Sequence, residues 1–355
     1  PSGVWIMAYT SIDDPSGTAF NTVLYTGNAS TRSITGVGFQ PDWVWIKVRN
    51  YDNGHQLFDV VRGVTKRLQT DTNGAEATRS SSITSFDSDG FSMGADAQIN
   101  DTSSYNYVAW NWKAGTSFSN DASATSVGSI DSSGSINTTV GFSIITYTGT
   151  GSAATFAHGL SAVPKCILFK KTSGSQGWGV YHDSIGNTGA LSLNTTDATD
   201  TTANYFNNTS PTSSVVTVNT NNSVNNSGGT MIAYCFAEKK GYSKFGKYTG
   251  NGSTDGTFIY TGFKPAFFML KKSSATDPWV IFDNKRATSN PFDKLIYPDS
   301  NEAESGSSER GDFLSNGVKF RSNHTYFNGS GITYVYMAFA EAPFVNSNGV
   351  PGNAR

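Results

Sequence analysis

Three segments of this chain repeat one short pattern of residues in the same order. Each segment begins with a Tyr-Thr-Gly turn, which starts at Tyr25, Tyr147 and Tyr248. A Gly and a Pro follow, then an apolar stretch that ends in Lys, a second stretch that ends in Asp, and a strand rich in aromatic residues. The repeat length of roughly 100 residues is that of a small β-sandwich domain, since solenoid repeats are only about 20–50 residues long. The pattern therefore predicts three domains of one architecture in tandem.

Apolar residues within each segment recur with a period of two, which is typical of β-strands. In the stretch Trp43–Val48 large residues occupy both faces, so we expect this strand to be covered on both sides. Asp89-Gly90 and Asn316-Gly317 separate short apolar runs, as the turns of β-hairpins do. No capped helical period exceeds two turns. The predicted fold is all-β, with three tandem antiparallel β-sandwich, jelly-roll-like repeats of six or seven short strands each.

Composition sets the expected domain boundaries. Residues 116–140 are nearly all small or polar, so we expect them to form a flexible or surface-tracking linker. They separate a first domain with an N-terminal extension, residues 1–115, from a second domain, residues 141–241. The third domain with a C-terminal tail, residues 242–355, follows almost directly. We therefore expect the second and third domains to pack rigidly, and the first to be held by its own interface or by a partner chain.

The low charge of the chain excludes several classes of function. Charged residues make up 15% of the chain, against about 25% in an average soluble protein, and the net charge is −2. A nucleic-acid partner needs clustered Lys and Arg, and the chain has no basic run, so this partner is excluded. No stretch approaches the roughly 20 apolar residues of a membrane-spanning helix, and the first residues lack the pattern of a signal peptide. We expect no membrane insertion.

Two cysteines are too few for a disulfide-stapled scaffold. Both Cys166 and Cys235 lie in apolar strand sequences, which predicts two free, buried thiols, with a disulfide between the two strands as the alternative.

A Lys and an Asp recur at the ends of two successive strands in every segment. The three pairs are Lys47 and Asp59, Lys170 and Asp183, and Lys271 and Asp283. One interpretation is three copies of a charged functional site. We favour a cross-strand ion pair that fixes strand register, which is worth about 0.2–1 kcal/mol if exposed.

The sequence contains no pattern of catalytic, cofactor-binding or metal-binding residues. Asp87-Ser88-Asp89-Gly90 resembles the start of a calcium-binding loop, but no Glu follows at the required offset, so a hairpin turn is the better interpretation. The four histidines are scattered, and no zinc spacing, nucleophile elbow, Walker loop or dinucleotide fingerprint occurs. His182 aligns with Phe58 and Phe282, which predicts a half-buried substitution. We therefore expect no enzyme activity and no cofactor.

Aromatic residues near loops that do not align between segments are candidates for glycan contact, because an exposed ring can stack on a sugar face. Ordinary loop packing is the alternative for each of them. The candidates are Tyr51, Trp178, Tyr205, Tyr297, Tyr326 and Phe327.

Several long phrases of the sequence resemble a domain of unknown function found in marine and cyanobacterial bacteriophages. They lie at residues 22–28, 34–47, 109–115, 230–238, 242–265 and 336–341. The resemblance extends over residues 20–355. It implies a tail or fibre structural protein of the virion, located on the phage particle outside the cell, with no known catalytic residues.

From this resemblance we expect a tail-fibre or tail-tip module that contacts the host cell surface. It would form a homo-oligomer, a trimer by analogy with other fibres, together with further virion proteins. One alternative is a capsid-decorating protein, and another is a self-polymerising extracellular filament that uses residues 1–18 as an added strand. A third is a carbohydrate-binding module or polysaccharide depolymerase, which would need a loop aromatic flanked by carboxylates and a host surface glycan as ligand.

Overall fold

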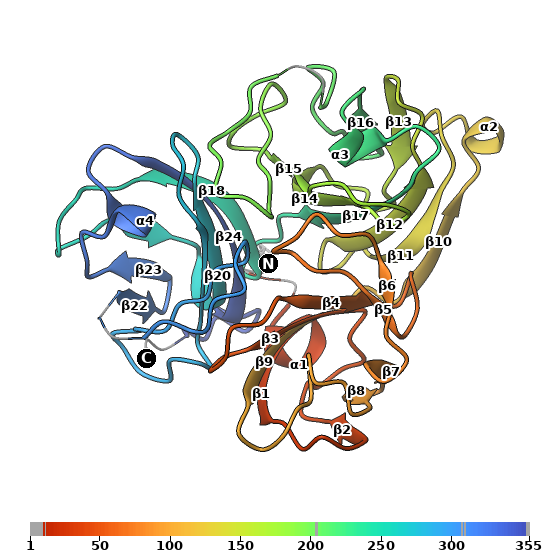
Figure 1. The fold of residues 1–355 in the computed structure, drawn as a ribbon. Coiled ribbons are helices and arrows are strands. Elements are labelled where there is room, and N and C mark those ends of the chain that lie inside the picture. Colours follow the sequence, from red (N-terminus) through yellow and green to blue (C-terminus); the bar gives the residue numbers. More distant parts are fainter. Residues whose placement is uncertain (1–9, 11, 203–204, 307, 309, 353–355) are drawn as a thin grey trace, which may run out of the picture.

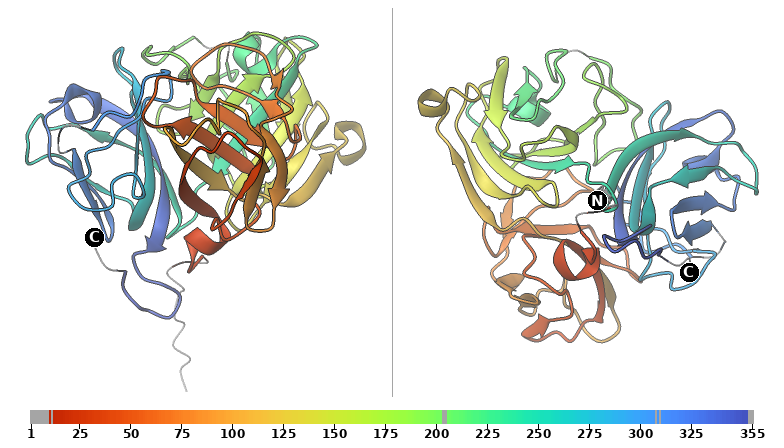
Figure 2. Two further views of the ribbon diagram at one scale, coloured as in Figure 1. Left: turned by 60° about the horizontal axis from the view of Figure 1, so that its bottom comes forward. Right: turned by 180° about the vertical axis from the view of Figure 1, so that it is seen from behind.

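The computed structural model describes residues 10, 12–202, 205–306, 308 and 310–352, which form three lobes around a common centre (Figure 1). We call residues 12–115 the first lobe, residues 116–241 the second lobe and residues 242–352 the third lobe. The view from behind shows the same arrangement of three lobes (Figure 2). Residues 1–9 and 11 of the segment that the filament alternative uses as an added strand lie outside the described residues.

The first lobe contains a four-stranded main sheet and a smaller three-stranded sheet. In spatial order the main sheet consists of β1 (Phe20–Thr26), β9 (Asn106–Trp112), β3 (Trp43–Val48) and β4 (Gln56–Asp59). The small sheet consists of β2 (Arg32–Ile34), β8 (Gly90–Met93) and β7 (Ile83–Asp87). The remaining elements are α1 (Pro15–Thr18) and the pair β5 (Lys66–Arg67) and β6 (Ala77–Thr78).

The second lobe has a six-stranded main sheet and a two-stranded small sheet. In spatial order the main sheet consists of β10 (Thr116–Asn120), β11 (Ser132–Asn137), β12 (Phe142–Thr148), β17 (Thr230–Ala237), β14 (Pro164–Lys171) and β15 (Gly179–His182). The small sheet consists of β13 (Ala154–Ala157) and β16 (Val215–Val218). The helices are α2 (Ala122–Thr125) and α3 (Asn222–Asn225).

The third lobe again has a four-stranded main sheet and a three-stranded small sheet. In spatial order the main sheet consists of β18 (Ser243–Thr249), β24 (Thr333–Pro343), β20 (Phe263–Lys272) and β21 (Trp279–Asp283). The small sheet consists of β19 (Phe258–Tyr260), β23 (Gly317–Phe320) and β22 (Gly311–Leu314), and α4 (Thr325–Asn328) is the helix.

The fold is all-β with antiparallel sheets, as the period-two pattern predicts. Four main-sheet strands of each lobe lie in the orders β1-β9-β3-β4, β12-β17-β14-β15 and β18-β24-β20-β21, so the first, last, second and third of these four along the chain occupy the same sheet positions. Both predicted hairpin turns are confirmed, because Asp87 pairs with Gly90 and Leu314 pairs with Gly317. No helix in the described part of the chain is long and apolar enough to cross a membrane.

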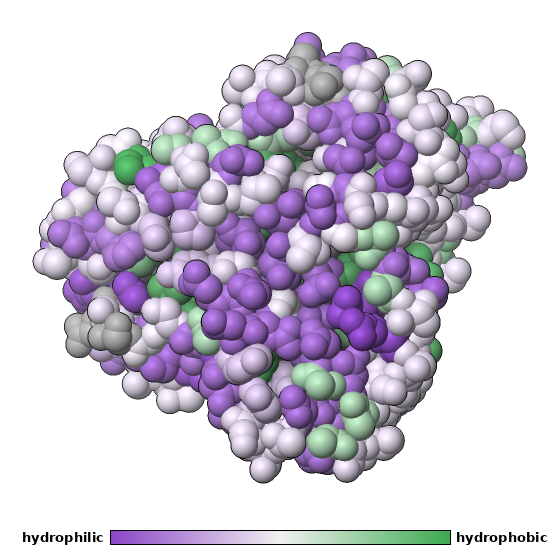
Figure 3. Space-filling model, viewed as in Figure 1, coloured by the Kyte–Doolittle hydropathy of each residue, from purple (hydrophilic) through white to green (hydrophobic). Residues whose placement is uncertain are grey.

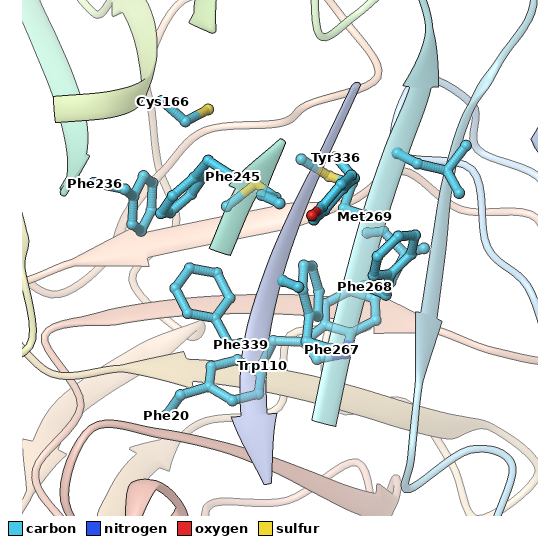
Figure 4. Packing of buried hydrophobic residues seen from close by; sticks show 14 of the residues in the cluster. Phe20, Trp110, Cys166, Phe236, Phe245, Phe267, Phe268, Met269, Tyr336 and Phe339 are labelled. Atoms are coloured by element: carbon cyan, nitrogen blue, oxygen red, sulfur yellow. The ribbon is translucent and has the colours of Figure 1, made fainter. Parts of the chain in front are cut away.

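One aromatic core fills the centre where the three main sheets meet (Figure 4). Trp43 of the first lobe stacks on Tyr234 of the second, with ring centres 4.7 Å apart. Phe339 of the third lobe contacts Trp112 of the first at 5.6 Å and Phe236 of the second at 5.7 Å. Because burial of apolar surface is the main favourable term in folding, each lobe depends on the other two to cover one face of its main sheet.

The opposite face of each main sheet packs against the small sheet of the same lobe. In the first lobe Val44 of β3 and Ile34 of β2 belong to one apolar cluster, and in the second lobe Ile167 of β14 and Phe156 of β13 belong to another. The central strands are therefore covered on both sides, and β3 is buried at every position, which confirms the expectation for this strand.

The predicted linker is wrong, because residues 116–140 are part of the second main sheet. β10 and β11 pair with each other, and β11 pairs with β12. Main-chain groups provide this pairing, so an edge strand needs few apolar side chains. Phe118 and Ile136 provide those few by packing against the core of the second lobe.

Candidate functional site

Three buried lysines fasten the lobes to one another. Lys47, Lys170 and Lys271 lie on β3, β14 and β20 and are completely buried. Each ammonium group donates a hydrogen bond to a main-chain carbonyl in the neighbouring lobe, on Asn301 (3.3 Å), Asn73 (3.1 Å) and Thr196 (3.1 Å), respectively. The contacts run from the first lobe to the third, from the second to the first and from the third to the second. The first lobe is thus held by its own interface with both neighbours.

Burial lowers the pKa of all three ammonium groups to about 8, so they remain charged at pH 7. Hydrogen bonds that involve a charged group contribute roughly 1.5–3 kcal/mol each. Each lysine also donates to carbonyls in its own lobe, for example Lys47 to Val48 at 2.8 Å and Lys271 to Lys272 at 2.9 Å. These lysines are therefore structural cations that hold a loop of the next lobe.

The predicted Lys–Asp ion pairs are wrong in all three lobes. Asp59 pairs across the sheet with Trp43, four residues from Lys47, which corresponds to a separation of roughly 13 Å along the strand. Asp59 instead binds Arg62 at 2.6 Å, and Asp283 binds Arg286 in the same i,i+3 arrangement. Asp183 binds Lys165 at 3.0 Å on the surface.

A second repeated contact uses ring nitrogens. The indole N–H groups of Trp178 and Trp279 donate to the carbonyls of Gln69 and Ser192, each at 2.8 Å. These carbonyls belong to the neighbouring lobe and precede the lysine-bound carbonyls by four residues. The ring contact and the lysine contact therefore hold the same loop.

His55 provides the corresponding ring contact of the first lobe, from its Nε2 to the carbonyl of Tyr297 at 2.9 Å. Its Nδ1 accepts a hydrogen bond from the indole of Trp45 at 2.8 Å, so the proton of the neutral ring is on Nε2. Burial, together with the charge of Lys47, holds the pKa of His55 well below its ordinary value. His55 is thus a neutral donor that stands where the other lobes have tryptophan.

The residue opposite the start of each central strand makes a third contact between lobes. In the first lobe Asp59 accepts a hydrogen bond from the hydroxyl of Tyr234 at 2.7 Å. In the third lobe Asp283 accepts one from the indole of Trp110 at 3.0 Å. Both aspartates also carry a buried arginine partner, so their charge is paired within the core.

In the second lobe His182 stands at this position, because it pairs with Cys166 as Asp59 pairs with Trp43. His182 therefore corresponds to Asp59 and Asp283, and its alignment with Phe58 and Phe282 is wrong by one residue. Asp183 lies outside this contact between lobes. The Nδ1 of His182 accepts from the amide of Ser184, so its Nε2 donates to the carbonyl of Tyr336 at 3.0 Å. Burial lowers the pKa of His182 to about 4, which keeps it neutral at pH 7.

The predicted glycan-contacting aromatics divide into exposed and buried residues. Tyr51 is exposed by 54% and packs edge-on against Tyr105. Three of the predicted positions are wrong because their rings are buried in the core, namely Trp178, Tyr205 and Phe327. Tyr297 and Tyr326 are partly buried and pack against each other, with ring centres 6.1 Å apart. The structure does not bring the six candidates together in one site.

Two exposed aromatics that the sequence analysis did not single out lie on β19. Phe258 is exposed by 45% and Tyr260 by 58%. The signal in the sequence is the alternation Phe-Ile-Tyr, in which the middle residue, Ile259, faces the core. On the face of the molecule seen in Figure 3, hydrophobic residues lie in small separate spots among hydrophilic ones.

Both cysteines are free and buried, as predicted. Cys166 faces the shared central core and Cys235 faces the core of the second lobe, so the two thiols lie on opposite faces of one sheet. Burial raises the pKa of Cys235 to about 12, which makes this thiol unreactive at pH 7.

Among the described residues, no three His, Cys, Asp or Glu side chains gather in a way that could hold a metal ion. The hollows on the surface are shallow and mostly polar. One of about 340 Å³ in the second lobe is lined by the carboxylates of Asp121 and Asp131 and by hydroxyl-bearing residues such as Ser119. One of about 490 Å³ in the third lobe is more apolar and includes Tyr260 and Phe344.

Comparison with known proteins gives one match, and it extends over all three lobes. No curated protein and no solved structure matches the chain. A family model matches residues 14–343 as one continuous unit. The chain belongs to this family, which is described as a domain of unknown function (DUF7483).

Proposed function

We propose that this chain is a non-enzymatic structural protein of a bacteriophage virion, a tail-fibre or tail-tip module that contacts the host cell surface. The observation that carries the proposal is the cyclic set of contacts made by Lys47, Lys170 and Lys271. Buried charged and ring donors are used here to lock three lobes into one rigid body. Such rigidity suits a part that transmits force or holds a binding surface at a fixed place.

We interpret the three lobes as three copies of one jelly-roll-like β-sandwich. The shared strand order of the main sheets and the recurrence of the lysine contact support this interpretation. The sequence phrases that resemble phage tail and fibre proteins support a location in the virion. The face seen in Figure 3 is mostly polar, with small apolar spots, which is compatible with a protein exposed on a particle.

Electron microscopy of phage particles labelled with an antibody against this chain tests the proposal directly. Label at the tail or its fibres is expected. Label spread over the head would favour a capsid-decorating role, and particles without label would refute a virion protein of either kind.

Binding to the host is a separate question that fluorescently labelled protein answers. We expect saturable binding to host cells. If cells do not bind the protein while particles carry it, the role is architectural.

Release of sugar from host envelope material by the purified chain would contradict the non-enzymatic proposal and favour a depolymerase. Light scattering tests the expected oligomer, since a monomer at high concentration is incompatible with a fibre made of this chain alone.

A further inference from the structure

The second and third lobes differ at the outer edge of the small sheet. In the second lobe this edge is covered, because the amides of Ser129 and Ile130 donate to the carbonyl of Thr155 at 2.7 and 3.1 Å. The amide of Thr155 in turn donates to the hydroxyl of Ser129 at 2.8 Å. The hydroxyl of Ser132 reaches the carbonyl of Ala157 at 2.8 Å. A segment of the chain thus pairs with β13 along its open side.

In the third lobe the matching edge of β19 is open. The amide of Phe320 donates to the carbonyl of Thr257, and the amide of Thr261 donates to the carbonyl of Asn316. Because paired and unpaired positions alternate in an antiparallel ladder, the main-chain groups of Phe258 and Tyr260 point away from β23. In the part of the chain that the structure describes, nothing pairs with them on that side.

The side chains beside this edge are aromatic only in the third lobe. The residues that flank the buried position of the small-sheet strand are Phe258 and Tyr260 in the third lobe, and Ser33 and Thr35 in the first. The fold therefore does not require aromatic residues here. Two exposed rings on an open strand edge are the features that an added strand recognises.

A groove continues from this edge, and the second lobe shows what fills such a groove. A Cβ atom placed on Gly159 would lie 2.8 Å from the ring of Phe118 and 3.1 Å from Ile136, which both belong to the β10–β11 hairpin. For a Cβ atom on Gly262 of the third lobe, the three nearest atoms all belong to the side chain of Tyr260 and lie 3.6–3.8 Å away, at ordinary contact distance. The hollow of about 490 Å³ lies here, with Phe344 and Val345 in its wall.

The described chain comes to this groove at its N-terminal end. Thr10 lies against Gly241, which lines the groove, because a Cβ atom on Gly241 would be 2.7 Å from the Cβ of Thr10. Residues 4–9, directly before it, have the sequence Val-Trp-Ile-Met-Ala-Tyr. Six extended residues span roughly 20 Å, which exceeds the length of the open edge of β19.

We propose that residues 4–9 of this chain bind as an added strand along the open edge of β19 and place an apolar side chain in the groove over Gly262. The neighbouring edge, β18, carries Lys244 and Lys247 where the paired strand β12 has Ser143 and Thr146. Edge lysines oppose strand pairing, so the segment is directed to β19. This inference does not depend on the proposed virion function.

Tryptophan fluorescence tests the proposal in the full chain. Six of the seven tryptophans are buried, each exposed by at most 3%, and Trp5 is the seventh. If residues 4–9 occupy the groove, acrylamide will quench almost none of the emission. The variant Tyr260→Asp puts a charge beside the groove and should make about one tryptophan in seven quenchable. The matched control Tyr51→Asp changes an equally exposed tyrosine in the first lobe and should leave the protection unchanged.

Two further measurements make the result decisive. Trp5→Phe in the Tyr260→Asp background should abolish the quenchable fraction, which assigns it to Trp5. Free quenching of Trp5 in the unchanged protein overturns the proposal. Protection that disappears on dilution, together with a dimer by light scattering, also overturns it, because the segment would then come from a second copy.

Discussion

The second and third lobes have the same order of four strands in the main sheet, but they close their open side differently. The second lobe adds the β10–β11 hairpin, which covers the edges of β12 and β13, whereas in the third lobe none of the described residues pairs with the outer edges of β18 and β19. The hydrogen bonds between lobes also differ, since the second lobe has His182 at the position where the third lobe has Asp283. The shared architecture therefore resides in the central strands, while the sheet edges and the residues that connect the lobes vary from lobe to lobe.

The largest effect is expected from Asp283→Ala in the third lobe. This change leaves the buried Arg286 without its main partner and removes the acceptor of Trp110, so the free energy of unfolding should fall by about 3–5 kcal/mol. Asp183→Ala, at the exposed neighbour of His182, should change it by less than about 0.5 kcal/mol. Urea denaturation of both variants measures the difference, and equal effects would show that the two lobes do not differ in this way.

Acid should destabilise the second lobe through His182. Burial keeps the folded pKa near 4, below the ordinary value of 6.5, so between these pH values only the unfolded chain binds the proton. Stability is therefore complete above about pH 6.5 and declines as the pH falls toward 4, by up to about 3 kcal/mol from this residue.

Urea denaturation at several pH values between 7 and 4 checks this expectation. The variant His182→Gln should show a shallower decline, with the remainder due to other buried histidines such as His158, whose pKa burial also lowers to about 4. An unchanged pH dependence in His182→Gln would contradict the assignment.

The buried lysines of the second and third lobes should contribute equally to the free energy of unfolding through their hydrogen bonds to the adjacent lobe. Lys170→Met and Lys271→Met each leave carbonyls of the adjacent lobe without a donor, which should lower the free energy of unfolding by about 1–3 kcal/mol. Lys165→Met, a substitution of a surface lysine, is the control and should have little effect. Thermal unfolding of the three variants ranks them, and a loss in one lobe only would break the equivalence of the joints.

The difference between two glycine variants tests the groove itself. Gly159 and Gly262 both have positive φ angles, of +69° and +81°, so alanine is strained at either position by about 1 kcal/mol. Gly159→Ala must also displace Phe118, which adds roughly 1–3 kcal/mol. At Gly262 the described residues leave room for a Cβ atom, so alanine there meets a further cost of this kind only from the side chain that we propose to lie in the groove. Denaturation midpoints compare the two variants. A larger loss for Gly262→Ala would mean that its groove is more tightly filled than that of Gly159.

Much of the local structure was predictable, but the role of its most regular feature was not. The recurrence of Lys47, Lys170 and Lys271 is visible in the sequence, yet their partners are carbonyls about 75–250 residues away, which strand spacing alone does not reveal. A difference of one residue between segments is enough to align His182 with Phe58 and Phe282 instead of with Asp59 and Asp283. Tyr51 and Trp178 both lie near loops in the sequence. Only the packing of the neighbouring lobe decides that Trp178 is buried and Tyr51 is exposed.

The sequence alone determined the strand content, the hairpin turns and the burial of both thiols, because these follow from the preferences of residues and their immediate neighbours. Tertiary structure decided which side of each sheet is shared, which hydrogen-bond donors connect the lobes and which strand edge has no partner among the described residues. These outcomes depend on surfaces that meet only after three separate sheets have come together around one core.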